Sequence, residues 1–459
     1  MTRTWVAGAV CLGLVLAGDA AAHKRDPYAV AIHFQPGNPA HVIAGTTFGL
    51  VASTDGGTTW RWACEQALAY QDPYDPDYAY GATGAVLMQT FVGLRVASDA
   101  CSFAATPLGA KFASKVAAGD DGALYAAVSD VDTADAAIYK STDGGATFPV
   151  AVTPAISDWW ESIEVSPVDA QRVYVAGFRV GPPRVQLLFR SDDGGASYTE
   201  LASTGLDAGM DSRIRVAGIG PAADTVYLHV TQDPASGGGD AIYRSTTAGA
   251  SWTKILTTTD PYGVSFLVRR SGQLVAATRT MGAQKSDDGG TTWQPIASAP
   301  HIASLAETPA GVVWAGTQTY AKPRDPGLPE VPADGAFLMT STDLATWTPR
   351  SALADIVGPL ACPGVHDECG VKNQGVGTAW CCLLYDDLKV PSQVLDCSGG
   401  NVCYGYQDAG VAGDITMPPP DPGCCGAGSS ESGLPTLLLG CILPGWQILR
   451  RRASPRQRR

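Results

Sequence analysis

One eight-residue phrase returns along this chain and sets the limits on its fold. Residues 53–60 read STDGGTTW, and residues 286–293 read SDDGGTTW. Further copies of the phrase, two of them shortened, begin at residues 98, 141, 191, 245 and 341. Neighbouring copies start 41 to 55 residues apart. A supersecondary unit repeated at this spacing is typical of propeller blades, so seven copies predict seven blades.

Each copy, which we call the repeated turn, is predicted to join two β-strands. Strand-like runs such as AAIYKS and QLLFRS precede it. Its aspartate can accept hydrogen bonds from turn amides, and its glycine supplies the positive φ of a tight reversal. Its closing aromatic ring is expected to be buried, and the burial of each ring should stabilise the fold by very roughly 2–3 kcal/mol. The predicted structural residues are Asp55, Gly57, Trp60, Asp143, Gly145, Phe148, Asp193, Gly195, Tyr198, Gly249, Trp252, Asp288, Gly290, Trp293, Asp343 and Trp347.

The form Ser-x-Asp-x-Gly-x-Thr-Trp resembles the Asp-box, or BNR repeat, of sialidases, sortilin-type propellers and two-propeller xyloglucanases. The resemblance covers residues 28–352, and the strand–turn–strand form of residues 31–46 and 163–177 is closest to the sortilin and xyloglucanase type. The resemblance implies that the boxes are fold elements on the face away from the ligand. We therefore expect their aspartates to be structural.

The expected fold is all-β: a seven-bladed β-propeller of four-stranded antiparallel blades over residues 28–352, with a small disulfide-rich module at residues 355–410. The composition agrees, because 53 glycines and 32 prolines accompany only 16% charged residues. The net charge is −13, and such an acidic surface repels phosphate backbones. Nucleic acid is therefore not an expected partner.

The first residues predict export. Residues 1–22 combine Arg3, an apolar run and a small-residue ending, which is the layout of a cleaved secretory signal peptide. A membrane anchor is the alternative, but the apolar run is short for a bilayer span.

The C-terminal segment consists of a Pro/Gly-rich spacer at residues 411–433 and a hydrophobic tail with an arginine cluster at residues 434–459. It resembles the MYXO-CTERM sorting tail of myxobacterial surface proteins. That resemblance implies processing near Cys424 and Cys425, lipid modification of one of them, and delivery to the cell surface by export and sorting machinery. Membrane contact is then expected only through the processed C-terminus; an ordinary one-helix anchor is the alternative.

The remaining cysteines predict disulfides, as expected of an exported chain. Cys64 and Cys101 lie in neighbouring blades, and we expect a bridge between them. Six more are predicted to form a three-disulfide module with its pairing open, and the zinc alternative lacks Cys-x-x-Cys spacing. These six are Cys362, Cys369, Cys381, Cys382, Cys397 and Cys403.

The ligand is expected on the rim opposite the repeated turns, where aromatic rings lie beside carboxylates, a combination that suits sugars. The candidate binding residues are Trp159, Trp160, Glu161, Tyr74, Tyr78 and Tyr262. The alternative for Trp159 and Trp160 is that they fill space between blades.

No catalytic residue, metal site or cofactor is expected. A sialidase needs an arginine triad, and the motif that precedes the first box of sialidases is missing here. The resemblance to xyloglucanases implies a catalytic cleft between two propellers, whereas this sequence predicts a single propeller. The expected function is a non-catalytic cell-surface binding module for a glycan or a protein, with a glycoside hydrolase as the alternative.

Overall fold

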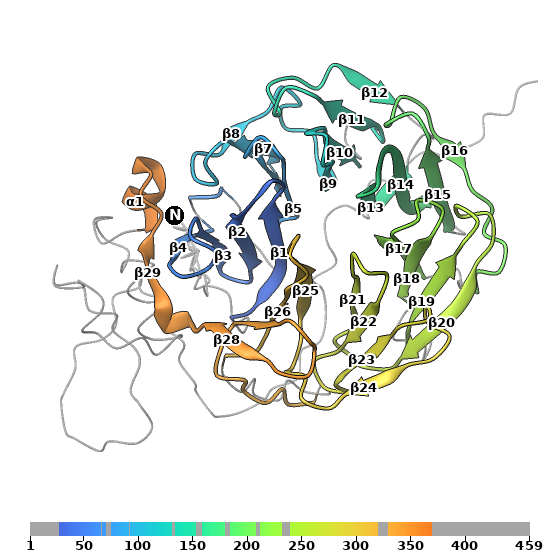
Figure 1. Ribbon diagram of the computed structural model, residues 1–459. Coiled ribbons are helices and arrows are strands. Elements are labelled where there is room, and N and C mark those ends of the chain that lie inside the picture. The colour runs from blue at the N-terminus through green and yellow to red at the C-terminus, as the bar shows by residue number, and fades with distance from the viewer. Residues whose placement is uncertain are drawn as a thin grey trace, which may run out of the picture.

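The chain folds into seven β-sheets arranged as blades around a central axis (Figure 1). All pairings within the seven blades are antiparallel, and six sheets have four strands while the first gains a fifth. The predicted all-β, seven-bladed propeller is therefore confirmed. The computed structural model describes residues 27–65, 67–69, 75–90, 92–130, 134–152, 158–179, 184–207, 212–231, 239–319 and 329–369.

Each blade is a meander whose strands follow in chain order from the axis outward. Blades 1 to 3 consist of β1 (Ala29–Gln35), β2 (Asn38–Thr46), β3 (Gly49–Ser53) and β4 (Trp60–Ala63); β5 (Tyr78–Tyr80), β6 (Val86–Thr90), β7 (Gly93–Ala97) and β8 (Ala104–Ala105); and β9 (Ala113–Ala118), β10 (Leu124–Val128), β11 (Ile138–Ser141) and β12 (Val150–Val152). Blades 4 and 5 consist of β13 (Asp158–Ser166), β14 (Asp169–Arg179), β15 (Val185–Ser191) and β16 (Thr199–Glu200); and β17 (Arg213–Ile219), β18 (Val226–Thr231), β19 (Asp240–Ser245) and β20 (Thr253–Thr258). Blades 6 and 7 consist of β21 (Ser265–Val268), β22 (Leu274–Ala277), β23 (Ala283–Ser286) and β24 (Gln294–Ile296); and β25 (Ser304–Glu307), β26 (Val313–Gly316), β27 (Leu338–Ser341) and β28 (Thr348–Ser351).

The hydrophobic core lies between the blades. One cluster joins Tyr125 of blade 3 to Trp160, Val173 and Phe189 of blade 4. Every residue of the second strands β6, β10, β22 and β26 is buried, because a neighbouring strand covers each edge and a neighbouring blade covers each face. This explains why β10, β22 and β26 read as continuous apolar runs rather than alternating ones.

The repeated turn joins the third strand of a blade to the fourth, as predicted. In blade 6, Ser286 Oγ donates to Asp288 Oδ1 (2.8 Å) and accepts from the Gly290 amide (2.8 Å). Asp288 also accepts hydrogen bonds from the amide and hydroxyl of Thr292, at 2.8 and 2.7 Å. These bonds from Thr292, followed by the one from Ser286, lower the pKa of Asp288 to about 2. The carboxylate is thus occupied by its own turn.

The same network recurs in other blades. Asp143 and Asp193 each accept from a Ser or Thr hydroxyl and amide four residues later, and those bonds lower the pKa of each carboxyl to about 2. Asp55 binds Thr59 in the same way, which also lowers its pKa. The closing rings of Trp60, Trp252 and Phe148 are buried, while those of Tyr198, Trp293 and Trp347 are partly buried.

Asp288→Ala should lower the Tm by about 2–4 °C, because the turn loses three hydrogen-bonded partners of its carboxylate. Asp287→Ala, which removes the adjacent aspartate with a single side-chain partner, Gln273, is the matched control and should change the Tm less. Thermal denaturation followed by circular dichroism measures both. Because the pKa of Asp288 is lowered, the stabilisation by this carboxylate is present above pH 3.8 and is lost as the pH falls toward 2. The Tm values of wild type and Asp288→Ala should therefore converge at that pH. Equal Tm values at neutral pH would contradict the structural role.

The ring closes without exchanging a strand between its first and last blades. Trp60 of blade 1 makes edge contacts with Trp314 and Phe337 of blade 7, with ring centroids 6.2 and 6.0 Å apart. After β28 the chain forms the 3-10 helix η2 (Leu353–Asp355) and then β29 (Ile356–Pro359). β29 pairs in parallel with β4, so the end of the propeller chain is fastened to the outer edge of blade 1.

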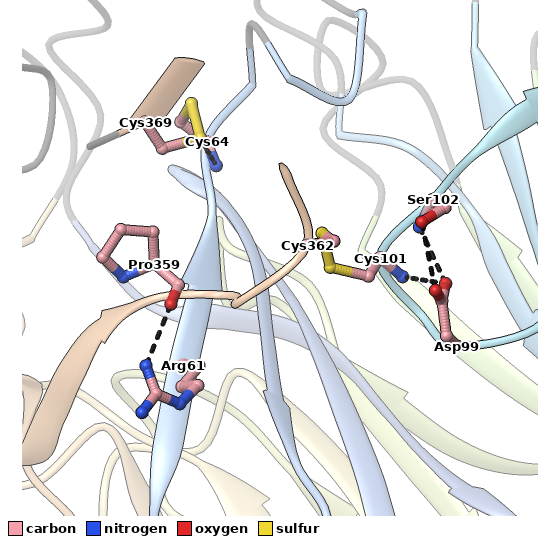
Figure 2. Close-up of a disulfide and its surroundings, with 8 residues drawn as sticks. All are labelled: Arg61, Cys64, Asp99, Cys101, Ser102, Pro359, Cys362 and Cys369. Carbon is pink, nitrogen blue, oxygen red and sulfur yellow. Dashed lines mark hydrogen bonds between the residues drawn. A yellow bond between two sulfur atoms is a disulfide. The ribbon is translucent and has the colours of Figure 1, made fainter. Parts of the chain in front are cut away.

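Two disulfides continue this attachment (Figure 2). Cys362, just after β29, is bonded to Cys101 of blade 2, and Cys369, at the end of helix α1 (Pro363–Cys369), is bonded to Cys64 of blade 1. The predicted Cys64–Cys101 bridge is therefore wrong, and so is the pairing of Cys362 and Cys369 within a separate module. The reason is that the chain returns past the outer edges of blades 1 and 2 after completing the ring.

The other cysteine predictions, for Cys381, Cys382, Cys397, Cys403, Cys424 and Cys425, lie outside the described residues, as do the signal peptide, the spacer and the hydrophobic tail. Within the described part of the chain, no helix has the length and apolar character needed to cross a membrane.

The double replacement Cys101→Ser and Cys362→Ser should lower the free energy of unfolding by about 2–4 kcal/mol, because this disulfide closes a long loop of the unfolded chain. Urea denaturation of the exported protein measures the change. Wild type treated with a reductant should be destabilised at least as much, since it loses Cys64–Cys369 as well. An unchanged denaturation midpoint in the double variant would show that the disulfide does not hold the ring closed.

Candidate binding site in the central channel

A cavity of about 570 Å³, which we call the central channel, lies on the propeller axis. Its walls come from the innermost strands β1, β5, β9, β13, β17 and β25, together with Arg270 after β21. It extends to Pro36, Asp120 and Pro309, which lie where first strands turn into second strands. The repeated turns occupy the same rim, as the hydrogen bond from the Gly194 amide to Gln171 at the start of β14 shows. The cavity therefore reaches the rim opposite the one predicted for the ligand.

One side of the channel carries a cluster of ionisable side chains from four blades. Asp77 lies 3.7 Å from the Lys115 ammonium, and its carboxylate accepts a hydrogen bond from the Val116 amide at 3.2 Å. Glu164 is accessible to solvent within the channel, but the enclosing walls and then the charge of Asp77 raise its pKa to about 8, against the opposing effect of Lys115. Burial lowers the pKa of His33, whose Nε2 is buried without a hydrogen-bond partner.

A second group of charges lies on β13 and β17. Glu161 is buried, and its carboxylate lies 3.3 Å from Arg215 Nε and 3.8 Å from Arg213 Nε. Both arginine side chains are about half exposed. They compensate the charge of Glu161 and leave guanidinium edges open to solvent. The channel thus offers a polar ligand both cationic hydrogen-bond donors and carboxylate acceptors.

The structure separates the residues proposed from the sequence. Glu161 and Tyr78 line the cavity, although the Tyr78 side chain is buried beside Gly45 of blade 1. Trp160 is fully buried, and its indole N–H donates to the Ala136 carbonyl at 3.0 Å, so it fills space between blades 3 and 4 and has no surface for a ligand. Trp159 is partly exposed. Tyr74 lies outside the described residues.

Tyr262 lies at the opposite rim, in the connection that leads into β21. Its hydroxyl donates to the Pro329 carbonyl at 2.9 Å. The guanidinium of Arg279 lies 4.8 Å from the centre of this ring and 4.3 Å from that of Tyr28, and Arg279 Nη2 donates to Gln318 at 2.6 Å. This cluster, like Trp159, is separate from the residues that line the cavity.

Sequence reasoning missed His33, Lys115, Glu164 and Arg215 as channel residues. The available signal was a charged or polar side chain within an otherwise apolar first strand, as in ASKVAA and SIEVS. No described group of three or more His, Cys, Asp or Glu side chains is placed to hold a metal ion.

The fold defines the class of this protein as a seven-bladed β-propeller. No protein-family model and no curated protein matches the chain. Its structure is similar to that of an ancestral GH74 enzyme (TM-score 0.49, 14% identity, covering 71% of this chain and 50% of that one). It is also similar to YCF48 from Cyanidioschyzon merolae (TM-score 0.42, 14% identity, 64% and 94% covered) and to the GH74 xyloglucanase from Xanthomonas campestris (TM-score 0.34, 12% identity, 71% and 74% covered). The chain thus spans half the length of the ancestral enzyme, and these likenesses carry no argument about activity.

Glu164→Gln should stabilise the protein at alkaline pH and leave it unchanged at acidic pH. Because the pKa of Glu164 is raised from 4.5 to about 8, the unfolded chain releases this proton first, and stability falls between those pH values. The variant escapes this loss, so its Tm should exceed that of wild type by about 2 °C or more above pH 8. Thermal denaturation across this range tests the shift, with Glu200→Gln on the outer strand β16 as a control for charge removal. A Tm difference independent of pH would contradict it.

Proposed function

We propose that this chain is a non-catalytic binding module of the cell surface and that a carbohydrate segment binds in the central channel. The observation that carries the proposal is the composition of the channel wall. Carboxylates, an ammonium, guanidinium groups and the imidazole of His33, whose Nε2 has no hydrogen-bond partner, line one cavity of about 570 Å³. Ligand pockets are commonly of this size, and hydroxyl-rich molecules can exchange hydrogen bonds with such a wall. A protein segment rich in polar side chains is the other ligand that this wall could accept.

The use of the aspartates in the repeated turns supports a binding role for the channel rather than for the rim. Asp55, Asp143, Asp193 and Asp288 each accept hydrogen bonds from their own turn, which uses their carboxylate oxygens locally. A ligand would have to replace these bonds to use the aspartates. This behaviour agrees with the resemblance of the turns to the Asp-box repeat, which we propose as the family relationship.

The cellular address belongs to the same proposal. The signal-like residues 1–22 and the MYXO-CTERM-like tail with Cys424 and Cys425 support export and attachment at the cell surface or outer membrane. The disulfides that join blades 1 and 2 to Cys369 and Cys362 are also what an oxidising compartment allows.

A glycoside hydrolase is the second candidate, and one observation favours it. Glu164 keeps its proton to a higher pH than an ordinary carboxyl, and the Asp77 carboxylate lies close enough to contribute to that shift. Hydrolysis of glycosidic bonds uses a protonated and an ionised carboxyl on either side of the bond. The two functions therefore share a site and differ in whether the bound bond is broken.

A glycan array, followed by titration of the bound glycans, tests the proposal on the exported full chain. We expect Lys115→Gln and Arg215→Gln to weaken binding about tenfold, because each removes a donor from the channel wall. Lys254→Gln on the outer strand β20 is the matched control. Absence of glycan binding, or binding that these changes leave intact, would refute the channel proposal. Release of reducing ends that Glu164→Gln and Asp77→Asn abolish would establish the hydrolase instead.

A further inference from the structure

In five blades the repeated turn closes the boundary with the preceding blade. Gly195 of blade 4 has a φ of 88°, and a Cβ added there would lie 2.9 Å from the Tyr125 ring of blade 3. A Cβ on Gly290 of blade 6 would lie 2.5 Å from Ile255 of blade 5. The glycine backbone therefore fits directly against the neighbouring blade. Blades 1, 3 and 5 follow the same rule through Gly57, Gly145 and Gly249.

Blade 7 closes the same boundary with a side chain. Its turn is shorter, and Asp343 Oδ1 accepts hydrogen bonds from the amides of Ala345 and Thr346, each at 2.8 Å. Leu344 takes the positive φ of this turn, at 63°, and its side chain is 2% exposed. It packs in one cluster with Ile296 of blade 6, so the leucine fills the space.

Blade 2 has the short turn of blade 7 without its leucine. Asp99 Oδ1 accepts hydrogen bonds from the amides of Cys101 and Ser102, at 2.9 and 2.7 Å, as Asp343 does for its own turn. Ala100, with a φ of 55°, therefore occupies the position of Leu344. The methyl group of Ala100 therefore takes the place that the larger side chain of Leu344 fills at the boundary between blades 6 and 7. A cavity of about 460 Å³ lies here between blades 1 and 2, and Ala100 is part of its wall.

The polar part of this wall is rich in hydroxyl groups and carries two charged side chains, Arg61 and Asp99. The Asp99 carboxylate accepts hydrogen bonds from the Cys101 amide and from the amide and hydroxyl of Ser102, so its own turn uses its oxygens. Thr54 and Ser98 are exposed along the wall, and His41 is partly exposed. Arg61 is exposed and donates from Nη1 to the Pro359 carbonyl at 3.1 Å (Figure 2). Within the described chain, Arg61 has no carboxylate partner.

The apolar part of the wall consists of Ile43, Ala52, Tyr80 and Leu360, together with Ala100. Leu360 belongs to the segment after β29, which the Cys101–Cys362 disulfide fastens beside the cavity. The wall is therefore assembled from two blades and the residues that follow β29, and the Cys101–Cys362 disulfide holds one side of it.

We propose that this cavity between blades 1 and 2 binds a small acidic saccharide whose carboxylate pairs with Arg61. The volume suits one or a few sugar rings, and the hydroxyl groups of the wall can bond to those of a sugar. A guanidinium edge binds a carboxylate through paired hydrogen bonds, which a neutral sugar cannot accept in the same way. The cavity shares Gln35 and Tyr80 with the wall of the central channel, but Arg61 and Ala100 do not line the channel. The proposal does not depend on the function proposed for the channel.

The variant Ala100→Leu tests the proposal because the protein already accepts leucine in the equivalent turn. Calorimetric titration of the exported full chain with sodium D-glucuronate should show binding, and D-glucose should bind about tenfold more weakly. Ala100→Leu and Arg61→Gln should each weaken glucuronate binding about tenfold or more, and Arg61→Lys should retain part of it. Lys254→Gln, on the outer strand β20, should leave this affinity unchanged.

Three results would overturn the proposal. Glucuronate that does not bind, glucuronate that binds no better than glucose, or binding that survives Ala100→Leu would each exclude it. The Tm of each variant identifies one that has failed to fold, and in that case Arg61→Gln, at an exposed position, decides the outcome. Loss of glucuronate binding in Arg215→Gln but not in Ala100→Leu would place the anion in the channel.

Discussion

Contact between neighbouring blades is the constraint on which the rest of this structure depends. A single four-stranded blade has two apolar faces and cannot bury either by itself, so the sheets are stable only as a closed ring. The second strands β6, β10, β22 and β26 are buried throughout because each is enclosed by both adjacent blades. The repeated turns contribute at this level as well, since their local hydrogen bonds fix a backbone shape that fits the preceding blade.

Ring closure places the heaviest demand on blade 1. Every blade is built from consecutive strands, so no shared strand links blade 7 to blade 1. Indole contacts, the parallel pairing of β29 with β4 and two disulfides take the place of such a strand. Blade 2, whose turn is the most altered, is the one to which the Cys101–Cys362 bond adds a covalent link. The alteration at Ala100 and the disulfide next to it thus occur in the same turn.

The fold could be predicted because the repeated turn is a local structure: its serine, aspartate and glycine bind one another within a few residues. Features set by distant parts of the chain could not be predicted. Cys64 and Cys101 lie in neighbouring blades, yet their partners arrive only after the chain has completed the ring. The channel residues His33, Lys115 and Glu164 come from three blades and share no linear spacing. Trp160 stands beside a carboxylate as a sugar-binding ring would, but its register in β13 turns it into the space between blades.

The position of Cys369 has a consequence for how the molecule would be held. The described chain ends there, on the outer edge of blade 1 and away from the axis. A tether that continued from this point would be joined to the outer circumference of the disc rather than to one of its flat faces. Under the surface attachment proposed above, both flat faces of the disc would be accessible, and long polymers could approach either of them.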